Sequence, residues 1–192
     1  MQPACLDLPV TKGATLRKPL LLMQPTYTYR PITAIAQSAP LRLTVPEHGL
    51  PGDWPTWIEG SNWSALNRDK GREGFRIAKR VDADTLDYND LNGLGQRAQG
   101  GTLVYQLPVD LAGCRAVLLI TPDAGQPIEL TTENGGLAIA GLGRLLLEMT
   151  AAQTAAIDWA EARYNLDITF TDGSVQRWLQ GKVTVNGGCC HG

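Results

Sequence analysis

The residue types that could carry out chemistry are few and scattered in this chain. Its two histidines are His48 and His191, and its four cysteines include the adjacent pair Cys189 and Cys190. A catalytic triad would need one of these histidines near a serine nucleophile, but no GxSxG motif is present. His48 lies among turn-forming residues just before Gly49, where the imidazole is expected to fix the loop by hydrogen bonding. We therefore predict no catalytic residues and no enzymatic activity.

The C-terminal residues 187–192 bring two thiols and an imidazole together. Cys189, Cys190 and His191 are ligands that suit Zn²⁺ or an iron–sulfur centre. A closed site needs a fourth ligand, which Cys5 could supply if the two ends of the chain met. A free tail, or a tail whose thiols contact a neighbouring subunit, explains the same residues. We predict no metal centre and no cofactor.

Two further segments have compositions that could suit a bound ion: a cluster of aspartates and a glycine-rich stretch. Asp82, Asp84, Asp87 and Asp90 alternate in a way that could suit Ca²⁺, but the glycine and glutamate of an EF-hand loop are missing. A solvated strand followed by a turn is the expected structure there. The glycine-rich residues 93–101 lack the lysine of a phosphate-binding loop, and we expect a long connecting loop instead.

Tryptophan is the other residue type with a possible binding role. Of the five tryptophans, three lie close together in the sequence: Trp54, Trp57 and Trp63. Exposed tryptophans stack on sugars or anchor protein interfaces, whereas buried ones fill a small core. We expect Trp57 in the core, because it ends a strand-like segment. Trp63, in a turn, is the expected contact residue.

The elements that must position these residues are predicted to be strands. The chain has 192 residues, 43% of them hydrophobic and 19% charged, with a net charge of −2, 21 glycines and 12 prolines. These values indicate a folded protein, and the near-neutral charge argues against a nucleic-acid binder. Short apolar segments between turn formers favour an all-β fold. The first residues hold no apolar core of signal-peptide length, so folding in the cytoplasm is expected.

Individual strands follow from apolar alternation and turn residues. Residues 164–171 alternate clearly, and Asp172–Gly173 predicts a hairpin after them. Pro19 predicts an edge position or a bulge for the first strand. Thr150 and Gln153 form a capping box, which predicts one helix over residues 150–163. The expected strands are 15–23, 27–30, 41–45, 54–58, 74–80, 102–107, 114–121, 128–132, 136–140, 144–149, 164–171 and 175–185.

The C-terminal part of the chain resembles the immunoglobulin-like β-sandwich module of tailed-phage tail and baseplate proteins. In that module a "YDLEITFxDG" segment precedes an "xRLLxGxVxV" strand. The residues that carry the resemblance are Tyr164, Leu166, Asp172, Gly173, Arg177, Leu179, Gly181 and Val183. The segment "LPVTKGATLRKPLLL" near the N-terminus is similar to the first strand of the same family.

The middle of the chain is similar to a different module, the FCCH-type domain found in phage proteins. That domain takes its name from the first catalytic-cysteine half-domain of ubiquitin-activating enzymes. The residues that carry the similarity are Ile32, Thr33, Pro40, His48, Gly49, Leu50, Gly52, Asp53, Leu66, Asn67, Asp84, Thr85, Gly100 and Gly101. A module inserted at a loop of a sandwich is tolerated when its two ends lie close together.

These resemblances imply a fold, a division of the chain and a function. The expected fold is an immunoglobulin-like β-sandwich (residues 1–31 and 106–186) with an inserted small FCCH-like β-barrel (32–105), one short helix, and a tail (187–192). The implied function is a structural component of a tailed-bacteriophage virion, in the tail tip, baseplate or fibre-attachment region. Its partners would be other virion proteins in several symmetric copies, with no nucleic acid and no membrane span. Two alternatives stay open: a host-glycan receptor-binding module that uses Trp63, and a neck or capsid decoration protein.

Overall fold

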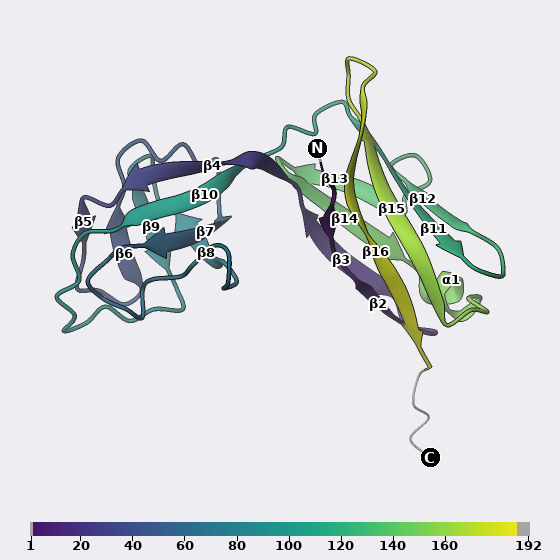
Figure 1. The fold of residues 1–192 in the computed structure, drawn as a ribbon, viewed down its shortest axis with the longest axis horizontal. Helices are drawn as coiled ribbons and strands as arrows, with labels where there is room; N and C mark the ends of the chain where they lie inside the picture. Colours follow the sequence, from purple (N-terminus) through teal and green to yellow (C-terminus); the bar gives the residue numbers. More distant parts are fainter. Residues whose placement is uncertain (1, 188–192) are drawn as a thin grey trace. The chain divides into compact units, whose positions relative to one another are not determined.

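The computed structural model describes residues 2–187, which form β-strands and one short helix (Figure 1). The all-β fold class predicted from the sequence is confirmed. Within the described residues, no helix is long and apolar enough to cross a membrane. The elements are β1 (Ala4–Cys5), β2 (Leu8–Thr11), β3 (Leu16–Leu21), β4 (Met23–Pro31), β5 (Ala34–Ile35), β6 (Leu41–Thr44), β7 (Trp54–Glu59), β8 (Arg76–Arg80), β9 (Thr85–Tyr88), β10 (Thr102–Pro108), β11 (Arg115–Pro122), β12 (Ile128–Thr131), β13 (Leu137–Gly141), β14 (Arg144–Met149), α1 (Ala151–Ala155), β15 (Glu161–Thr169) and β16 (Val175–Asn186).

The chain divides into two compact units, which are described separately. Unit 1 comprises Met1–Leu22 and Pro108–Gly192, and unit 2 is the intervening Met23–Leu107. The sequence-based division placed residues 23–31 with the sandwich. In the structure these residues form β4, which pairs with β10 in the sheet of unit 2. The border therefore precedes β4, because a strand belongs with the sheet that satisfies its backbone hydrogen bonds.

Unit 1 is a sandwich of two sheets around one core. The larger sheet has the strand order β1-β16-β15-β11-β12, with β2 also paired to β16, and the smaller has the order β13-β14-β3. Alternate residues of both sheets point inward, as the burial of Leu118 and Ile120 on β11 and of Leu145 and Leu147 on β14 shows. β3 lies at a sheet edge, as Pro19 predicts.

Unit 1 closes on itself where the chain leaves for unit 2 and returns. The Leu22 amide donates to the Gly143 carbonyl (2.8 Å), and the Gly143 amide donates to the Val109 carbonyl (2.7 Å). The Val109 amide in turn donates to the Leu22 carbonyl (3.1 Å). These three bonds form a ring of backbone groups that holds the outgoing and returning segments side by side.

Unit 2 is a single curled sheet with the order β4-β10-β7-β8-β9-β6-β5 (Figure 1). Its two outermost strands, β4 and β5, are separated in the chain only by Ile32 and Thr33. The Ile32 amide bonds to the Gly101 carbonyl beside β10 (3.0 Å), and the Thr33 amide bonds to Thr44 on β6 (2.9 Å). One continuous segment thus joins both sides of the sheet, which gives the unit its barrel-like form. Inside it, Leu41, Leu86 and Leu103 are fully buried.

The helix is shorter than the sequence predicts. The capping box is present: the Gln153 amide donates to the Thr150 hydroxyl (3.2 Å) and the Thr150 amide donates to Gln153 Oε1 (2.8 Å). The helix nevertheless ends after Ala155, and the residues expected in its last turn belong to β15. Ala162 pairs there with Pro122 on one side and Val183 on the other. The prediction of a helix to residue 163 was wrong because sheet pairing outweighs the helix propensity of alanine.

Candidate functional site

His48 is held inside unit 2 as a neutral structural group. Its side chain is fully buried, and the Leu50 amide donates to its Nδ1 (3.1 Å). Nε2 therefore carries the proton and donates to the Asp82 carbonyl (2.9 Å). Burial is the main cause that lowers the pKa of His48, which keeps the ring uncharged. Both ring nitrogens are thus occupied in fixing the loop, as the sequence analysis expected.

The four alternating aspartates do not converge on one point. Asp82 Oδ1 accepts from the Asp84 amide (2.8 Å), and Asp84 Oδ1 accepts from the Glu47 amide (2.7 Å). Asp87 pairs with Arg42, whereas Asp90 pairs with Arg76. Within residues 2–187, no group of three or more histidine, cysteine or acidic side chains is placed to hold a metal ion.

The cysteines fall into two sets. Cys189, Cys190 and His191 lie outside the described residues. Cys5 is exposed on β1, and its sulfur accepts a weak bond from Gln180 Nε2 (3.9 Å). Cys114 is half-buried, and burial raises the pKa of its thiol, which makes it a poor nucleophile. Three of the four ligands considered for a metal site, Cys189, Cys190 and His191, thus lie outside residues 2–187.

The tryptophans have different environments. Trp57 is buried, as predicted, and its indole Nε1 donates to the Glu73 carbonyl (3.0 Å). Trp63 is half-buried in a loop where its amide and carbonyl both bond to the Ser61 hydroxyl. This arrangement fixes the backbone of Trp63 but does not place it among other aromatic rings.

The aromatic rings that do gather lie on the outer face of unit 2. We call this group, formed by Tyr27, Tyr29, Trp57 and Phe75 with the amine of Lys70, the aromatic face. The Trp57 ring makes edge contacts with Tyr27 (centroids 5.9 Å apart) and with Phe75 (6.1 Å). Lys70 Nζ lies 5.6 Å from the Tyr27 ring centroid and 5.3 Å from that of Tyr29. Both distances are within the range of cation–π attraction.

Strand alternation explains why these side chains meet. Successive residues of a strand point to opposite faces of a sheet, so Trp57 of β7 lies on the face opposite to that of Thr56 and Ile58. Pro55 of β7 pairs with Ile77 of β8, so Phe75, two residues before Ile77, reaches the same face. Tyr27 and Tyr29 are likewise two residues apart on β4, which makes them neighbours on one face.

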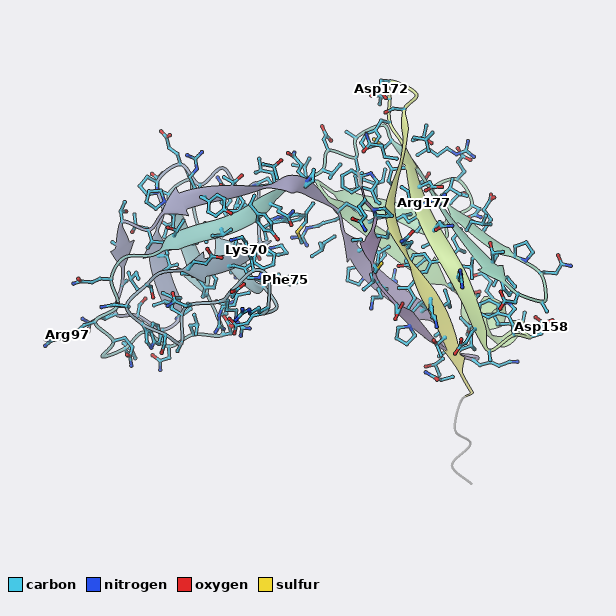
Figure 2. The ribbon with its side chains drawn as sticks, viewed as in Figure 1. Lys70, Phe75, Arg97, Asp158, Asp172 and Arg177 are labelled. Atoms are coloured by element: carbon cyan, nitrogen blue, oxygen red, sulfur yellow. The ribbon has the colours of Figure 1, made fainter. Side chains whose placement is uncertain are left out.

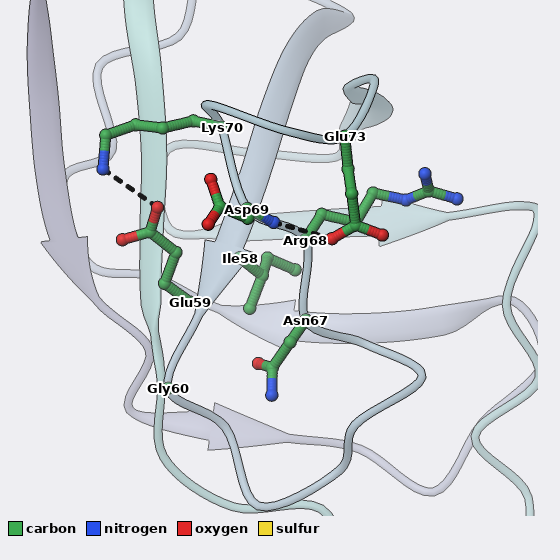
Figure 3. A pocket seen from close by; sticks show the side chains of 8 residues that line it. All are labelled: Ile58, Glu59, Gly60, Asn67, Arg68, Asp69, Lys70 and Glu73. Carbon is green, nitrogen blue, oxygen red and sulfur yellow. Dashed lines mark hydrogen bonds and ion pairs between the residues drawn. The ribbon is translucent and has the colours of Figure 1, made fainter.

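A polar pocket of about 460 Å³ adjoins the aromatic face. Figure 3 shows its lining and the bond between Lys70 Nζ and Glu59 Oε1 (2.9 Å). That hydrogen bond is the main cause that raises the pKa of Lys70, so the amine stays charged. Figure 2 shows Lys70 and Phe75 on unit 2. The lining residues are Ile58, Glu59, Gly60, Asn67, Arg68, Asp69, Lys70 and Glu73.

Comparison with family models, with curated proteins and with solved structures gave no match.

The arrangement is suited to binding rather than to bond chemistry. Its exposed members are two rings, Tyr29 and Phe75, next to a lysine that is paired with a carboxylate. The sequence analysis missed the contribution of β4, although the alternation Tyr27-Thr28-Tyr29 was a signal that two rings share one face. The contribution of Phe75 needed the pairing of β7 with β8, which the sequence did not reveal.

Proposed function

We propose that this chain is a structural component of a tailed-bacteriophage virion, in the tail tip, baseplate or fibre-attachment region. In this proposal unit 1 attaches to neighbouring virion proteins through a sheet edge. The resemblance carried by Tyr164, Asp172, Gly173 and Gly181 supports the virion assignment, and one feature of unit 1 supports attachment by a sheet edge. That feature is the exposed edge strand β13.

β13 differs from the other edge strands of unit 1 in carrying no proline and no charged residue. Edge strands normally carry proline or charged residues, or are very short, because their unpaired backbone groups attract other strands. β3 has Pro19 together with Arg17 and Lys18, β12 has Glu129, and β2 has Pro9. β1 contains only two residues. β13, with the sequence LAIAG, has neither a charge nor a proline.

The exposure of β13 fits this role. Residues 138–141 are all exposed, and Ile139 has 38% of its surface in solvent. Leu142, in the turn that follows, is 45% exposed. The register with β14 shifts between Ile139 and Gly141, so the straight part of the edge comprises Leu137, Ala138 and Ile139. Backbone hydrogen bonds from an added strand, together with the Ile139 side chain, would provide affinity there.

The test is incorporation into particles. Tailed particles purified from a host that expresses the chain should contain it in several copies, and immunogold labelling should place it at the tail. An Ile139→Lys variant puts a charge on the β13 edge, and its content in particles should fall at least about tenfold, which corresponds to about 1.4 kcal/mol.

A matched control separates the edge from general surface charge. Val175 is the most exposed large apolar residue of unit 1 (63%) and lies beside the β15–β16 hairpin, so Val175→Lys should be incorporated normally. Absence of the wild-type chain from purified particles would overturn the virion assignment. Normal incorporation of folded Ile139→Lys would overturn attachment through β13. Label at the neck or head would select the decoration-protein alternative.

A further inference from the structure

We propose that the aromatic face and the adjoining pocket of unit 2 bind an uncharged saccharide. Apart from Trp57, which was expected in the core, the residues of this face were not singled out from the sequence, and the proposal does not depend on where the chain lies in a virion. Four observations carry it: the exposed ring area, the fixed orientation of the rings, the charge balance of the pocket, and the prolines of β4.

The exposed ring area is that of a small-ligand site. Tyr29 is 53% exposed and Phe75 is 45% exposed. A whole aromatic side chain has about 200 Å² of surface, so the exposed fractions of Tyr29 and Phe75 together amount to about 200 Å². A stable protein interface needs about 800 Å² from each partner. Even with Ile77, which lies on the same face and is 47% exposed, this surface stays well below that area, so it suits the apolar face of one or two sugar rings better than a protein.

The rings are held in place before any ligand arrives. Trp57 is buried beneath Tyr27 and Phe75 and meets both edge-on, and its indole is tied to the Glu73 carbonyl. Lys70 fixes Tyr29 from the loop side. Side chains that are ordered in the free protein lose little entropy on binding, which favours a ligand that makes few contacts.

The pocket carries both signs of charge in nearly equal number. Glu59, Asp69 and Glu73 are acidic, whereas Arg68 and Lys70 are basic. Lys70 is already paired with Glu59, and Glu73 accepts from the Asp69 amide (2.8 Å). A charged ligand would meet a group of its own sign within the pocket. A sugar hydroxyl both donates and accepts, so it can bond to either member of the Lys70–Glu59 pair without breaking it.

The free edge of β4 is blocked against peptide strands. The Ile32 amide points to β10, where it bonds to Gly101. Backbone amide and carbonyl groups point alternately to the two sides of a strand. The free edge of β4 therefore presents the backbone groups of every second residue, namely Pro25, Tyr27, Tyr29 and Pro31. Two of these four positions have no amide hydrogen, so an added strand finds donors only at the two tyrosines. This favours a saccharide over an extended peptide as the ligand of the aromatic face.

The experiment is an NMR titration of the full chain with methyl glycosides of glucose, galactose, mannose and N-acetylglucosamine, up to about 50 mM. At least one glycoside should shift the ring resonances of Tyr29 and Phe75 together with Lys70. Phe75→Ala and Tyr29→Ala should each weaken binding about tenfold, because each removes one stacking surface.

Leu94→Ala is the matched control. Leu94 is 60% exposed in the same unit but is not part of the aromatic face, so this variant should bind normally. The proposal is overturned if no glycoside shifts these resonances, or if folded Phe75→Ala binds as well as wild type. It is also overturned if the chain self-associates and Phe75→Ala abolishes that association, since the surface would then bind a second copy. None of these results bears on whether the chain is present in virions.

Discussion

The hydroxyl group of Tyr164 donates a 2.6 Å hydrogen bond to the carbonyl oxygen of Leu6. This bond ties Leu6, which lies between the edge strands β1 and β2 beside β16, to β15, the next strand of the large sheet of unit 1. Gly181 lies directly opposite Tyr164 in the β15–β16 register, and a Cβ there would overlap the Leu6 carbonyl. Tyr164 and Gly181 therefore have one shared structural task, which is to hold Leu6 against β15 and β16.

We predict that Gly181→Ala destabilises unit 1 by about 1–3 kcal/mol, because the added methyl group displaces the Leu6 backbone. Thermal or urea unfolding measures the change. Gly187→Ala is the control, since nothing lies within 4 Å of a Cβ at position 187. That variant should stay within about 0.5 kcal/mol of wild type. Equal stability of the two variants would contradict the crossing of Leu6 over Gly181.

His48 should make stability depend on pH near neutrality. Its pKa is lowered from 6.5 in the folded protein, so the unfolded chain takes up a proton first as the pH falls. Stability is therefore complete above pH 6.5 and declines as the pH falls from 6.5 toward the folded pKa. Urea unfolding between about pH 7.5 and 5 measures the decline. His48→Gln should flatten it, and an equally steep decline in that variant would assign the effect to other groups.

Thr56 and Tyr88 form a buried hydroxyl pair inside unit 2, 2.7 Å apart. The Thr56 hydroxyl donates to the Arg76 carbonyl (3.4 Å), so the Tyr88 hydroxyl donates to Thr56. Thr56→Val leaves the Tyr88 hydroxyl without an acceptor and should lower stability by about 1–3 kcal/mol. Tyr88→Phe should be milder, at about 1 kcal/mol. Chemical denaturation of both variants and of the double variant should show coupling; strictly additive effects would rule the pair out.

Asp87 is a second source of pH dependence, at lower pH. Arg42 holds it by two bonds of 2.7 and 2.8 Å and, through them, lowers the pKa of Asp87 below 3.8. The stabilisation is complete above pH 3.8 and disappears as the pH falls through the folded pKa. Acid unfolding of Asp87→Asn should lose part of this dependence. Glu133 forms an ion pair with Arg115 in which both side chains are exposed, whereas the Asp87 side chain is largely buried. Glu133→Gln should therefore lower stability less than Asp87→Asn, and a larger loss in Glu133→Gln would contradict this prediction.

The sequence predicted most strands of the sandwich, because their signals are local. The alternation after Tyr164 and the turn at Asp172–Gly173 correspond to β15, β16 and their hairpin, where the Ser174 amide bonds to Asp172 Oδ1 (2.9 Å). β1 and β2 were missed because they are parallel partners of β16 from the opposite end of the chain. No local pattern encodes such a pairing, since its partners are distant in sequence.

The candidate site was harder to predict for the same reason. Trp57 was correctly placed in the core, but the rings around it come from β4 and from the residue before β8, and only the sheet order brings them together. Trp63 was the expected contact residue on the basis of its turn. The structure gathers the exposed rings at Tyr29 and Phe75 instead, where strand alternation, not turn composition, decides what faces outward.

The ring of backbone hydrogen bonds among Leu22, Gly143 and Val109 lies within unit 1 and holds together the two points between which unit 2 is inserted. Because unit 1 itself holds the two junctions side by side, an inserted domain needs only to have its two ends close together. An exchange of unit 2 for another domain with closely spaced ends would therefore leave the core of unit 1 unchanged.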